Sequence, residues 1–490
     1  MIAEKQVYRR FCVSSVRATL AFVILHPNQS RSSFEAPNCR KQVASRPPLQ
    51  GRSTRLFFNG TRRLAFSTNM ANRNGFFVVC SDAADPSQIR IVITGLGLVT
   101  PLGNDVDDVY YALTKGKSGV TSFEHSLVRN GARITGEEIL EQSSIQYAKI
   151  ASKSALEHAK ITEDVLAAAD MSRWGVIVGT SEGGSGSEIS GALAKDTGVA
   201  GTVFSISCGA SSGAAAIITA ADHIRAGKAE VMICGGSEAP FSSSSANVLE
   251  ALYAAGVLAN GNGKMDASAL SRPWDQDRCG VVLGEGAGIL VLEELEHATA
   301  RGAPVYAEYL GGNISFDHKG SQESSNLAST MLRALDDAAL SVEEVDYINA
   351  NACSSPTTDA IEIGAIREII PESRLEEVWI NSTKSLIGHS LGASGAIEAI
   401  TSIKALTTGI MHPTANLING DACLTGLNVV GVKAKVPFPK IKTAISNSFS
   451  LGSSAGSNAT IVFAAYRNMG PVPRGFLKSE ALRRGETLEI

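Results

Sequence analysis

The sequence predicts a layered α/β fold with a large buried core. Short apolar runs rich in β-branched residues, typical of strands buried on both faces, alternate with segments whose apolar residues recur at helical spacing. Strands and helices alternate in this way in both halves of the chain. The glycine-rich loops lack the phosphate-binding G-x-x-x-x-G-K-[ST] pattern and are interpreted as close-packing turns. We therefore expect two similar α/β halves, residues 89–300 and 301–466.

In the first half, strands and helices are predicted in alternation. The predicted strands are Ile89–Leu96, Gly175–Gly179, Glu230–Cys234 and Gly288–Leu292. The predicted helices are Ser144–Ala159, Ala210–Arg225 and Leu295–Ala300, and Thr180–Ser187 (TSEGGSGS) is a glycine loop.

The second half repeats this rhythm. Helices are predicted at Asn326–Ala339, Asp359–Ile369 and Ala393–Thr408, and strands at Val345–Asn349, Trp379–Ser382, Thr443–Ser446 and Ala459–Ala464. The polar tail, residues 467–490, is expected to be loose.

The N-terminal extension differs in charge from the rest of the chain. The 490 residues carry a net charge of -4, but residues 1–80 hold 13 Lys and Arg and two acids, Glu4 and Glu35. This Arg-rich, Ser-rich and acid-poor composition predicts a disordered transit extension, residues 1–82, and a place in the plastid stroma. A disordered tail of no consequence is the alternative. The apolar stretch Ala18–Leu25 resembles a signal-peptide core but is too short to span a bilayer, so import through the secretory route stays open.

Composition also limits the partners and cofactors. The net charge argues against a nucleic-acid role, and nothing after the leader is typical of a membrane span. Outside the leader, five cysteines are scattered without C-x-x-C spacing: Cys208, Cys234, Cys279, Cys353 and Cys423. Neither a disulfide framework nor a metal site is indicated, and no cofactor is expected.

Several segments resemble one enzyme family. The run SRPWDQDRCGVVLGEGAG (Ser271–Gly288) is similar to the SRPFD-x-x-R-x-G-F-x-x-GEGAG signature of β-ketoacyl-acyl-carrier-protein synthases. NSTKSLIGHSLGASGAIEAI (Asn381–Ile400) resembles their N-x-x-K-S-x-x-GH-x-x-GAAG-x-x-E block, and VITGLGLVTPLGN (Val92–Asn104) their opening strand and turn. Together these matches imply the thiolase-like fold, with α/β/α/β/α layers, of the plant plastid synthase I/II group.

The resemblance implies a decarboxylative Claisen condensation between acyl and malonyl thioesters of acyl carrier protein. In the family, a cysteine at a strand-to-helix elbow takes the acyl chain, and two histidines bind the malonyl thioester oxygen. The elbow here is FSISCGASSG (Phe204–Gly213), and Ala210 stands in the nucleophile's place. Cys208 lies two residues earlier, several ångströms along the chain, and is interpreted as a small buried apolar residue.

The remaining site residues are carried over one at a time. Asn351 takes the place of the first histidine; its amide can donate to an oxyanion but cannot shuttle a proton. The second histidine matches His389, the site lysine matches Lys384, and the acidic pair matches Asp359 and Glu362.

Two further departures bear on the acyl pocket. The family's N-S-F-G-F-G-G gate is here NSFSLGS, so Phe449 is kept, Leu451 replaces the second Phe, and two glycines become serines. Ser187–Phe204 is shorter than the family's stretch, which lines the pocket and much of the dimer contact. A genuine deletion and a skipped exon both explain the shortening.

Three hypotheses about function follow from these residues. The favoured hypothesis is a condensation-defective paralogue that acts as a partner subunit, in a homodimer or in a heterodimer with an active synthase. The alternatives are an active condensing enzyme of fatty acid synthesis and a degenerate copy. A variant of the favoured hypothesis decarboxylates the malonyl thioester with His389, Lys384 and Asn351.

Overall fold

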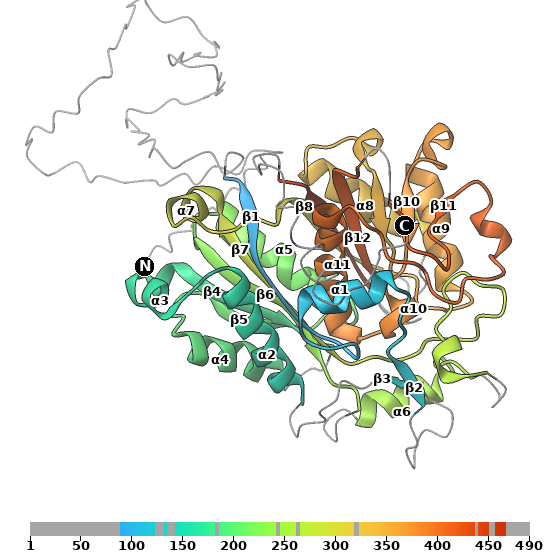
Figure 1. The fold of residues 1–490 in the computed structure, drawn as a ribbon, viewed down its shortest axis with the longest axis horizontal. Helices are drawn as coiled ribbons and strands as arrows, with labels where there is room; N and C mark the ends of the chain where they lie inside the picture. The colour runs from blue at the N-terminus through green and yellow to red at the C-terminus, as the bar shows by residue number, and fades with distance from the viewer. Residues whose placement is uncertain are drawn as a thin grey trace, which may run out of the picture. The chain divides into compact units, whose positions relative to one another are not determined.

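Eleven hydrogen-bonded strands form the main sheet in the part of the chain that the structure, a computed structural model, describes (Figure 1). The described residues are 89–122, 132–134, 143–181, 186–241, 246–260, 265–317, 323–436, 440–449 and 456–466. The predicted leader (1–82) and tail (467–490) lie outside them.

The strand order divides the sheet into two matching halves. The first half runs β5 (Val203–Ile206), β4 (Trp174–Gly179), β6 (Val231–Glu238), β7 (Gly286–Glu294) and β1 (Ile91–Val99). The second runs β10 (Trp379–Asn381), β9 (Tyr347–Asn349), β12 (Thr443–Phe449), β13 (Ser457–Ala464) and β8 (Ala307–Phe316), with β11 (Asn428–Val429) added beyond β10.

Strand directions are the same in both halves. In the first, β5, β4 and β6 are parallel, whereas β7 is antiparallel to both β6 and β1. In the second, β10, β9 and β12 are parallel, whereas β13 is antiparallel to both β12 and β8. The prediction of two similar α/β halves is therefore confirmed.

Two helices pack together between the halves. α5 (Ser212–Arg225) contacts β4 and β6 and reaches β8 and β13, while α11 (Ser394–Thr408) contacts β12 and β7. α2 (Ser143–His158) and α4 (Gly186–Thr197) cover the outer face of the first half, and α8 (Ser324–Asp337) covers that of the second, against α9 (Thr358–Ile369). The five predicted layers are therefore the outer helices of the first half, its strands, the helices α5 and α11, the strands of the second half, and the outer helices of the second half.

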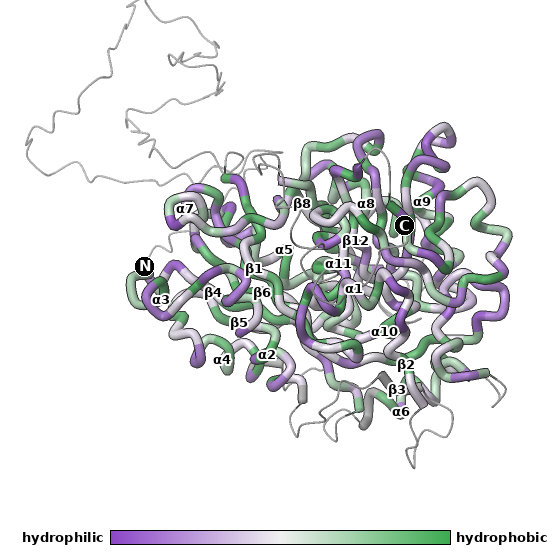
Figure 2. The backbone as a smooth tube through the Cα atoms, in the orientation of Figure 1, coloured by the Kyte–Doolittle hydropathy of each residue, from purple (hydrophilic) through white to green (hydrophobic). Residues whose placement is uncertain are grey.

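The pattern of burial explains why these segments form strands and helices. β1, β4, β6 and β7 are buried almost throughout, as expected of strands covered by helices on both faces. Figure 2 shows hydrophobic stretches along strands such as β6 and hydrophilic ones at outer helices such as α3 (Glu163–Ala168). No described helix is both long and apolar enough to cross a membrane.

Every predicted helix and strand is present, with ends shifted by a few residues. β8 was not predicted, because two adjacent glycines, Gly311 and Gly312, interrupt its apolar run. β8 pairs with β1 over three residues, so the two sheets expected separately are hydrogen-bonded into one. Other elements that were not predicted are shorter or more peripheral: α1 (Val106–Thr114), α3, α4, α6 (Ala246–Ala254), α10 (Lys384–Ile387), β2 (Val120–Ser122), β3 (Ala132–Ile134), β5 and β11.

The segment Ser187–Phe204 forms most of α4 and the start of the edge strand β5. Val203 and Phe204, on this edge strand, are 36% and 39% exposed. One side of β5 pairs with β4, and no strand pairs with its other side in the described part of the chain.

Candidate active site

The elbow lies between the edge strand β5 and the central helix α5. Gly209 adopts a left-handed conformation (φ 69°), which turns the chain before Ala210, and α5 begins two residues later at Ser212. Ala210 is 4% exposed, and its methyl group is the whole side chain at the place where the resemblance puts a nucleophile. The elbow geometry is present, and the Ala210 side chain itself offers no group that can be acylated.

Contacts between glycines bring the elbow close to the turn that carries His389. A Cβ on Gly213 would lie 2.7 Å from the carbonyl oxygen of Gly392, and one on Gly395 would lie 2.9 Å from the Cβ of Ala214 and 2.5 Å from Ser448 Oγ. These glycines join the start of α5, the start of α11 and the end of β12. The start of α5 thus packs against the turn that follows His389, and the start of α11 packs against Ser448, the neighbour of Phe449.

His389 is held by hydrogen bonds at its backbone and at one nitrogen of its ring. Its N–H donates to Val282 O and its carbonyl accepts from Gly284 N–H, both at 2.8 Å. The backbone N–H of Leu391 donates to Nδ1 at 3.0 Å, so Nδ1 is an acceptor and the proton resides on Nε2. Nε2 is buried and has no hydrogen-bond partner among the described residues.

The environment keeps the His389 ring neutral. Burial, with a further contribution from the Lys384 ammonium, lowers the pKa of His389 well below its usual range. A neutral ring with its proton on Nε2 offers a hydrogen-bond donor that has no partner among the described residues. Such a donor suits an oxygen that gains negative charge during a reaction.

Lys384 and Glu398 form a buried ion pair beside Asn351. Lys384 Nζ lies 2.6 Å from Glu398 Oε1, and each side chain is 2% exposed. Burial raises the pKa of Glu398 to about 7, although the Lys384 charge opposes this rise. Glu398 was not among the predicted site residues, although it is the last residue of the N-x-x-K-S block that contains Lys384.

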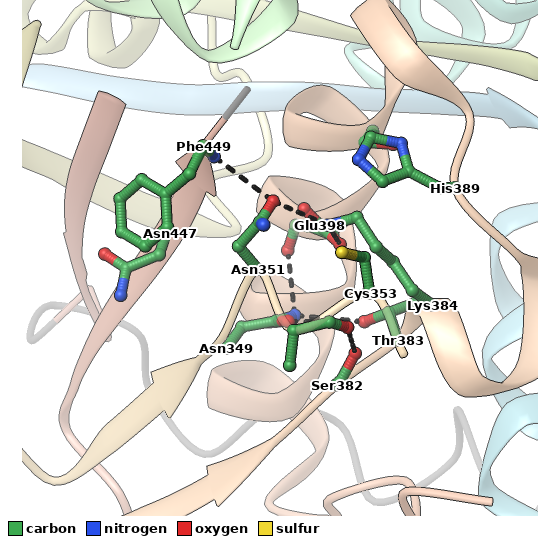
Figure 3. A network of polar contacts seen from close by, with 12 residues as sticks. Asn349, Asn351, Cys353, Ser382, Thr383, Lys384, His389, Glu398, Asn447 and Phe449 are labelled. Atoms are coloured by element: carbon green, nitrogen blue, oxygen red, sulfur yellow. Dashed lines mark hydrogen bonds and ion pairs between the residues drawn. The ribbon is translucent and has the colours of Figure 1, made fainter. Parts of the chain in front are cut away.

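Asn351 links the ion pair to the gate phenylalanine (Figure 3). Its Oδ1 accepts from Lys384 Nζ and from the backbone N–H of Phe449, both at 3.1 Å. Because both partners are donors, the atom that they bind is the amide oxygen, which leaves the Nδ2 amide without a partner among the described residues. Phe449 is 2% exposed and packs in the core of the second half.

Asp359 and Glu362 organise the loop that carries Asn351. Glu362 accepts from the backbone N–H groups of Asn351 at 2.9 Å and Ala352 at 2.8 Å, and Asp359 accepts from that of Cys353 at 2.9 Å. Burial raises the pKa of Glu362 to about 7 and that of Asp359 to about 6. In the described structure neither carboxylate is hydrogen-bonded to Lys384.

Two cysteines, Cys208 and Cys353, lie on the segments that carry Ala210 and Asn351. Burial raises the pKa of Cys353 to about 12, so its thiolate is scarce at neutral pH. Cys208 is half-buried rather than buried as expected, and its Sγ lies 3.6 Å from Ser211 Oγ. Leu451 lies outside the described residues. Within those residues, no cluster of His, Cys, Asp or Glu could hold a metal ion.

Two family models match this chain. Residues 141–298 match the β-ketoacyl synthase N-terminal domain, and residues 306–418 match its C-terminal domain. Chloroplastic 3-oxoacyl-[acyl-carrier-protein] synthase I of Arabidopsis thaliana is 37% identical over 432 residues, which cover 78% of this chain and 88% of the relative. 3-Oxoacyl-[acyl-carrier-protein] synthase 2 of Vibrio cholerae is 34% identical over 423 residues, covering 77% and 99%.

Solved structures show the same architecture. A type II polyketide synthase ketosynthase in complex with its acyl-carrier protein superposes with a TM-score of 0.70 at 30% identity, covering 77% of this chain and 99% of the other. A β-ketoacyl synthase from Burkholderia phymatum gives 0.68 at 29% identity, covering 78% and 100%. The fold is therefore the thiolase-like fold of ketosynthases. The chain belongs to the β-ketoacyl synthase family, in the group of 3-oxoacyl-[acyl-carrier-protein] synthases I and II.

Proposed function

We propose that this protein is a condensation-defective member of its family that acts as a partner subunit of an active synthase. The observation that carries the proposal is Ala210. An alanine at the elbow allows no acyl-enzyme, so the two-step route through a covalent intermediate is closed.

The contacts of Asn351 support the same conclusion. An amide cannot accept and return a proton as an imidazole can. Its oxygen is also engaged by Lys384 Nζ and by the N–H of Phe449. The place of the family's first histidine is therefore occupied by Asn351, whose amide oxygen holds Lys384 and the Phe449 backbone in position. Its remaining chemistry is hydrogen-bond donation through Nδ2.

The exposed edge strand β5 supports association with a second ketosynthase chain. Apolar side chains on an unpaired strand edge favour pairing with another strand. A solved relative described as the ishigamide ketosynthase/chain length factor, whose name joins two components, superposes with a TM-score of 0.67 at 26% identity. We place the partner contact at Val203 and Phe204, with either a second copy or an active synthase.

Acyl carrier protein and its acyl and malonyl thioesters are the proposed ligands. The neighbour solved with its acyl-carrier protein supports this choice, as do the synthase I and II relatives. The donor groups at His389 Nε2 and Asn351 Nδ2 suit the carbonyl oxygen of a thioester.

Mass spectrometry tests the central claim. After incubation of the purified protein with acyl-carrier protein carrying an acyl chain, no acyl adduct is expected. Condensation with malonyl-carrier protein should be lower than that of an active synthase by a factor on the order of 10⁶, as when a catalytic nucleophile is removed. A thioester on Cys208 would overturn the proposal.

The double variant Ala210→Cys with Asn351→His identifies where catalysis was lost. Some acylation should return if these two positions alone are responsible. A double variant that stays inactive would place a further defect in the shortened segment, residues 187–204, or in the loop that contains Leu451.

A second candidate function is decarboxylation of the malonyl thioester without condensation. The specific observation in its favour is the unpartnered Nε2–H of His389, which can stabilise the enolate left when carbon dioxide departs. The test is carbon dioxide release from malonyl-carrier protein by the wild type and by His389→Leu. Equal release from both would reject this role.

We also propose that the protein works in the plastid, after removal of residues up to about Asp82. The chloroplastic synthases of Arabidopsis thaliana and Hordeum vulgare among its relatives support this location, as does the basic leader. N-terminal sequencing of the mature protein is the test. A mature start within the first thirty residues would contradict a plastid transit peptide.

A further inference from the structure

One residue beside His389 departs from the family block and touches the ring. The family's GAAG is Gly392-Ala393-Ser394-Gly395 here, so a serine replaces the second alanine. Ser394 is the first residue of α11 and is 4% exposed. A buried hydroxyl needs a hydrogen-bond partner, since leaving one unpaired costs about 1–3 kcal/mol.

The hydroxyl of Ser394 finds its partner on the imidazole. Ser394 Oγ lies 3.1 Å from His389 Nδ1. No other hydrogen bond of this hydroxyl occurs within the described structure. The ring nitrogen therefore accounts for the hydrogen bond that this buried group needs.

The direction of this hydrogen bond follows from a second contact. The backbone N–H of Leu391 reaches the same Nδ1 at 3.0 Å and can only donate. Nδ1 must therefore carry a lone pair, and the Ser394 O–H must donate to it as well. Leu391 reaches Nδ1 from a left-handed conformation (φ 44°), which costs energy for a branched side chain and is held by the surrounding turn.

We propose that Ser394 is a positioning residue that fixes His389 as a neutral Nε2–H donor. Two donors on Nδ1 disfavour the tautomer protonated there and make Nδ1 a poorer proton acceptor. The Nε2–H is then a buried donor without a partner among the described residues. The His389 ring can then donate a hydrogen bond but is a poor group for proton transfer. In the same site, Asn351 stands where the family has its other histidine.

This inference deepens the proposed function, since it concerns the same thioester site. Its direct consequence is a property of the free protein, independent of any substrate. Failure of the inference and failure of the proposed function can therefore be told apart.

The experiment is ¹⁵N NMR of the intact protein labelled at histidine, with His389 assigned from the spectrum of His389→Leu. In the wild type, Nε2 should give a protonated, pyrrole-type resonance and Nδ1 a hydrogen-bonded, pyridine-type one. In Ser394→Ala the Nδ1 resonance should move downfield, toward a free pyridine-type nitrogen. Ser394→Thr keeps a hydroxyl and should restore the wild-type position.

Ser402→Ala is the matched control. Ser402 is also buried on α11, and its hydroxyl donates to Glu398 O at 2.7 Å, away from the imidazole. This variant should leave both His389 resonances in place. A proton on Nδ1 in the wild type would overturn the proposal. An Nδ1 resonance unmoved by Ser394→Ala, or moved equally by Ser402→Ala, would also overturn it.

Discussion

Lys384 shows how a single buried charge constrains the residues around it. Its ammonium is removed from water and compensated by Glu398 at 2.6 Å and by the oxygen of Asn351 at 3.1 Å. The amide is neutral, so the carboxylate supplies the compensating charge. A buried pair of this kind contributes little net stability as a whole, but removing one partner leaves an uncompensated charge.

Glu398→Gln should therefore destabilise the fold strongly. We expect the free energy of unfolding, measured by urea denaturation near pH 8, to fall by about 3–5 kcal/mol. The control is Glu377→Gln, which removes the exposed partner of Arg374 (Glu377 is 65% exposed) and should cost less than about 0.5 kcal/mol. Equal losses in the two variants would contradict the role given to Glu398.

At the scale of elements, the site depends on how closely α5 approaches the start of α11. Gly213, on α5, lies against the backbone of Gly392, and a Cβ on Gly236 of β6 would lie 2.4 Å from the same carbonyl oxygen. The carbonyl belongs to the backbone, so it cannot move aside as the end of a flexible side chain can. These glycines set the distance between the elbow and the His389 turn.

Gly213→Ala should push these elements apart. The added methyl group would lie 2.7 Å from Gly392 O, and overpacking of this kind costs about 1–3 kcal/mol. Gly191→Ala is the matched control, because Gly191 lies in the helix α4 with no atom within 4 Å of its Cβ position. That change should be neutral or stabilise by up to about 1 kcal/mol. Thermal unfolding of both variants measures the difference, and similar shifts would count against close packing at Gly213.

At the scale of the whole molecule, buried titratable groups make stability depend on pH in opposite directions. Burial lowers the pKa of His412 to about 4 and raises that of Glu398 to about 7. His412 thus favours the folded state at higher pH and Glu398 at lower pH. A variant that removes only one of these groups separates its contribution to the pH dependence of stability from that of the other.

His412→Asn should reduce the loss of stability in acid. Between pH 6.5 and pH 4 the unfolded chain binds a proton at His412 and the folded protein does not, so this contribution is lost as the pH falls. The lost contribution is about 3 kcal/mol by pH 4. Asparagine can still donate to Pro413 O, as the His412 Nδ1–H does at 2.9 Å. Urea unfolding at several pH values tests this, and parallel curves for wild type and variant would contradict it.

The partner contact that we propose at the edge strand β5 predicts an effect of charge at this edge. Phe204→Glu places a charge on that edge and should weaken self-association by tenfold or more, on the order of 1.4 kcal/mol. Ile418→Glu makes the same change at a residue that is 72% exposed and far from β5 in the sequence, and should have no effect. Sedimentation of both variants is the measurement. Loss of association in Ile418→Glu alone would move the interface away from β5.

The sequence by itself determined the layered α/β class and the family, and it placed an alanine at position 210. Periodicity reports burial one segment at a time, so strands such as β6 and helices such as α11 could be read locally. Covalent chemistry depends on residue identity, and the alanine side chain at position 210 cannot itself be acylated, whatever surrounds it.

Only the tertiary structure decided how the site's polar groups are shared. The oxygen of Asn351 joins Lys384 to Phe449, which lies 98 residues further along the chain. Likewise, three residues of β1 pair with β8 and join the two sheets. Hydrogen-bond direction, tautomer and strand partner depend on which groups meet in space. These contacts arise from packing between segments that are far apart in the sequence, and a local sequence pattern does not predict them.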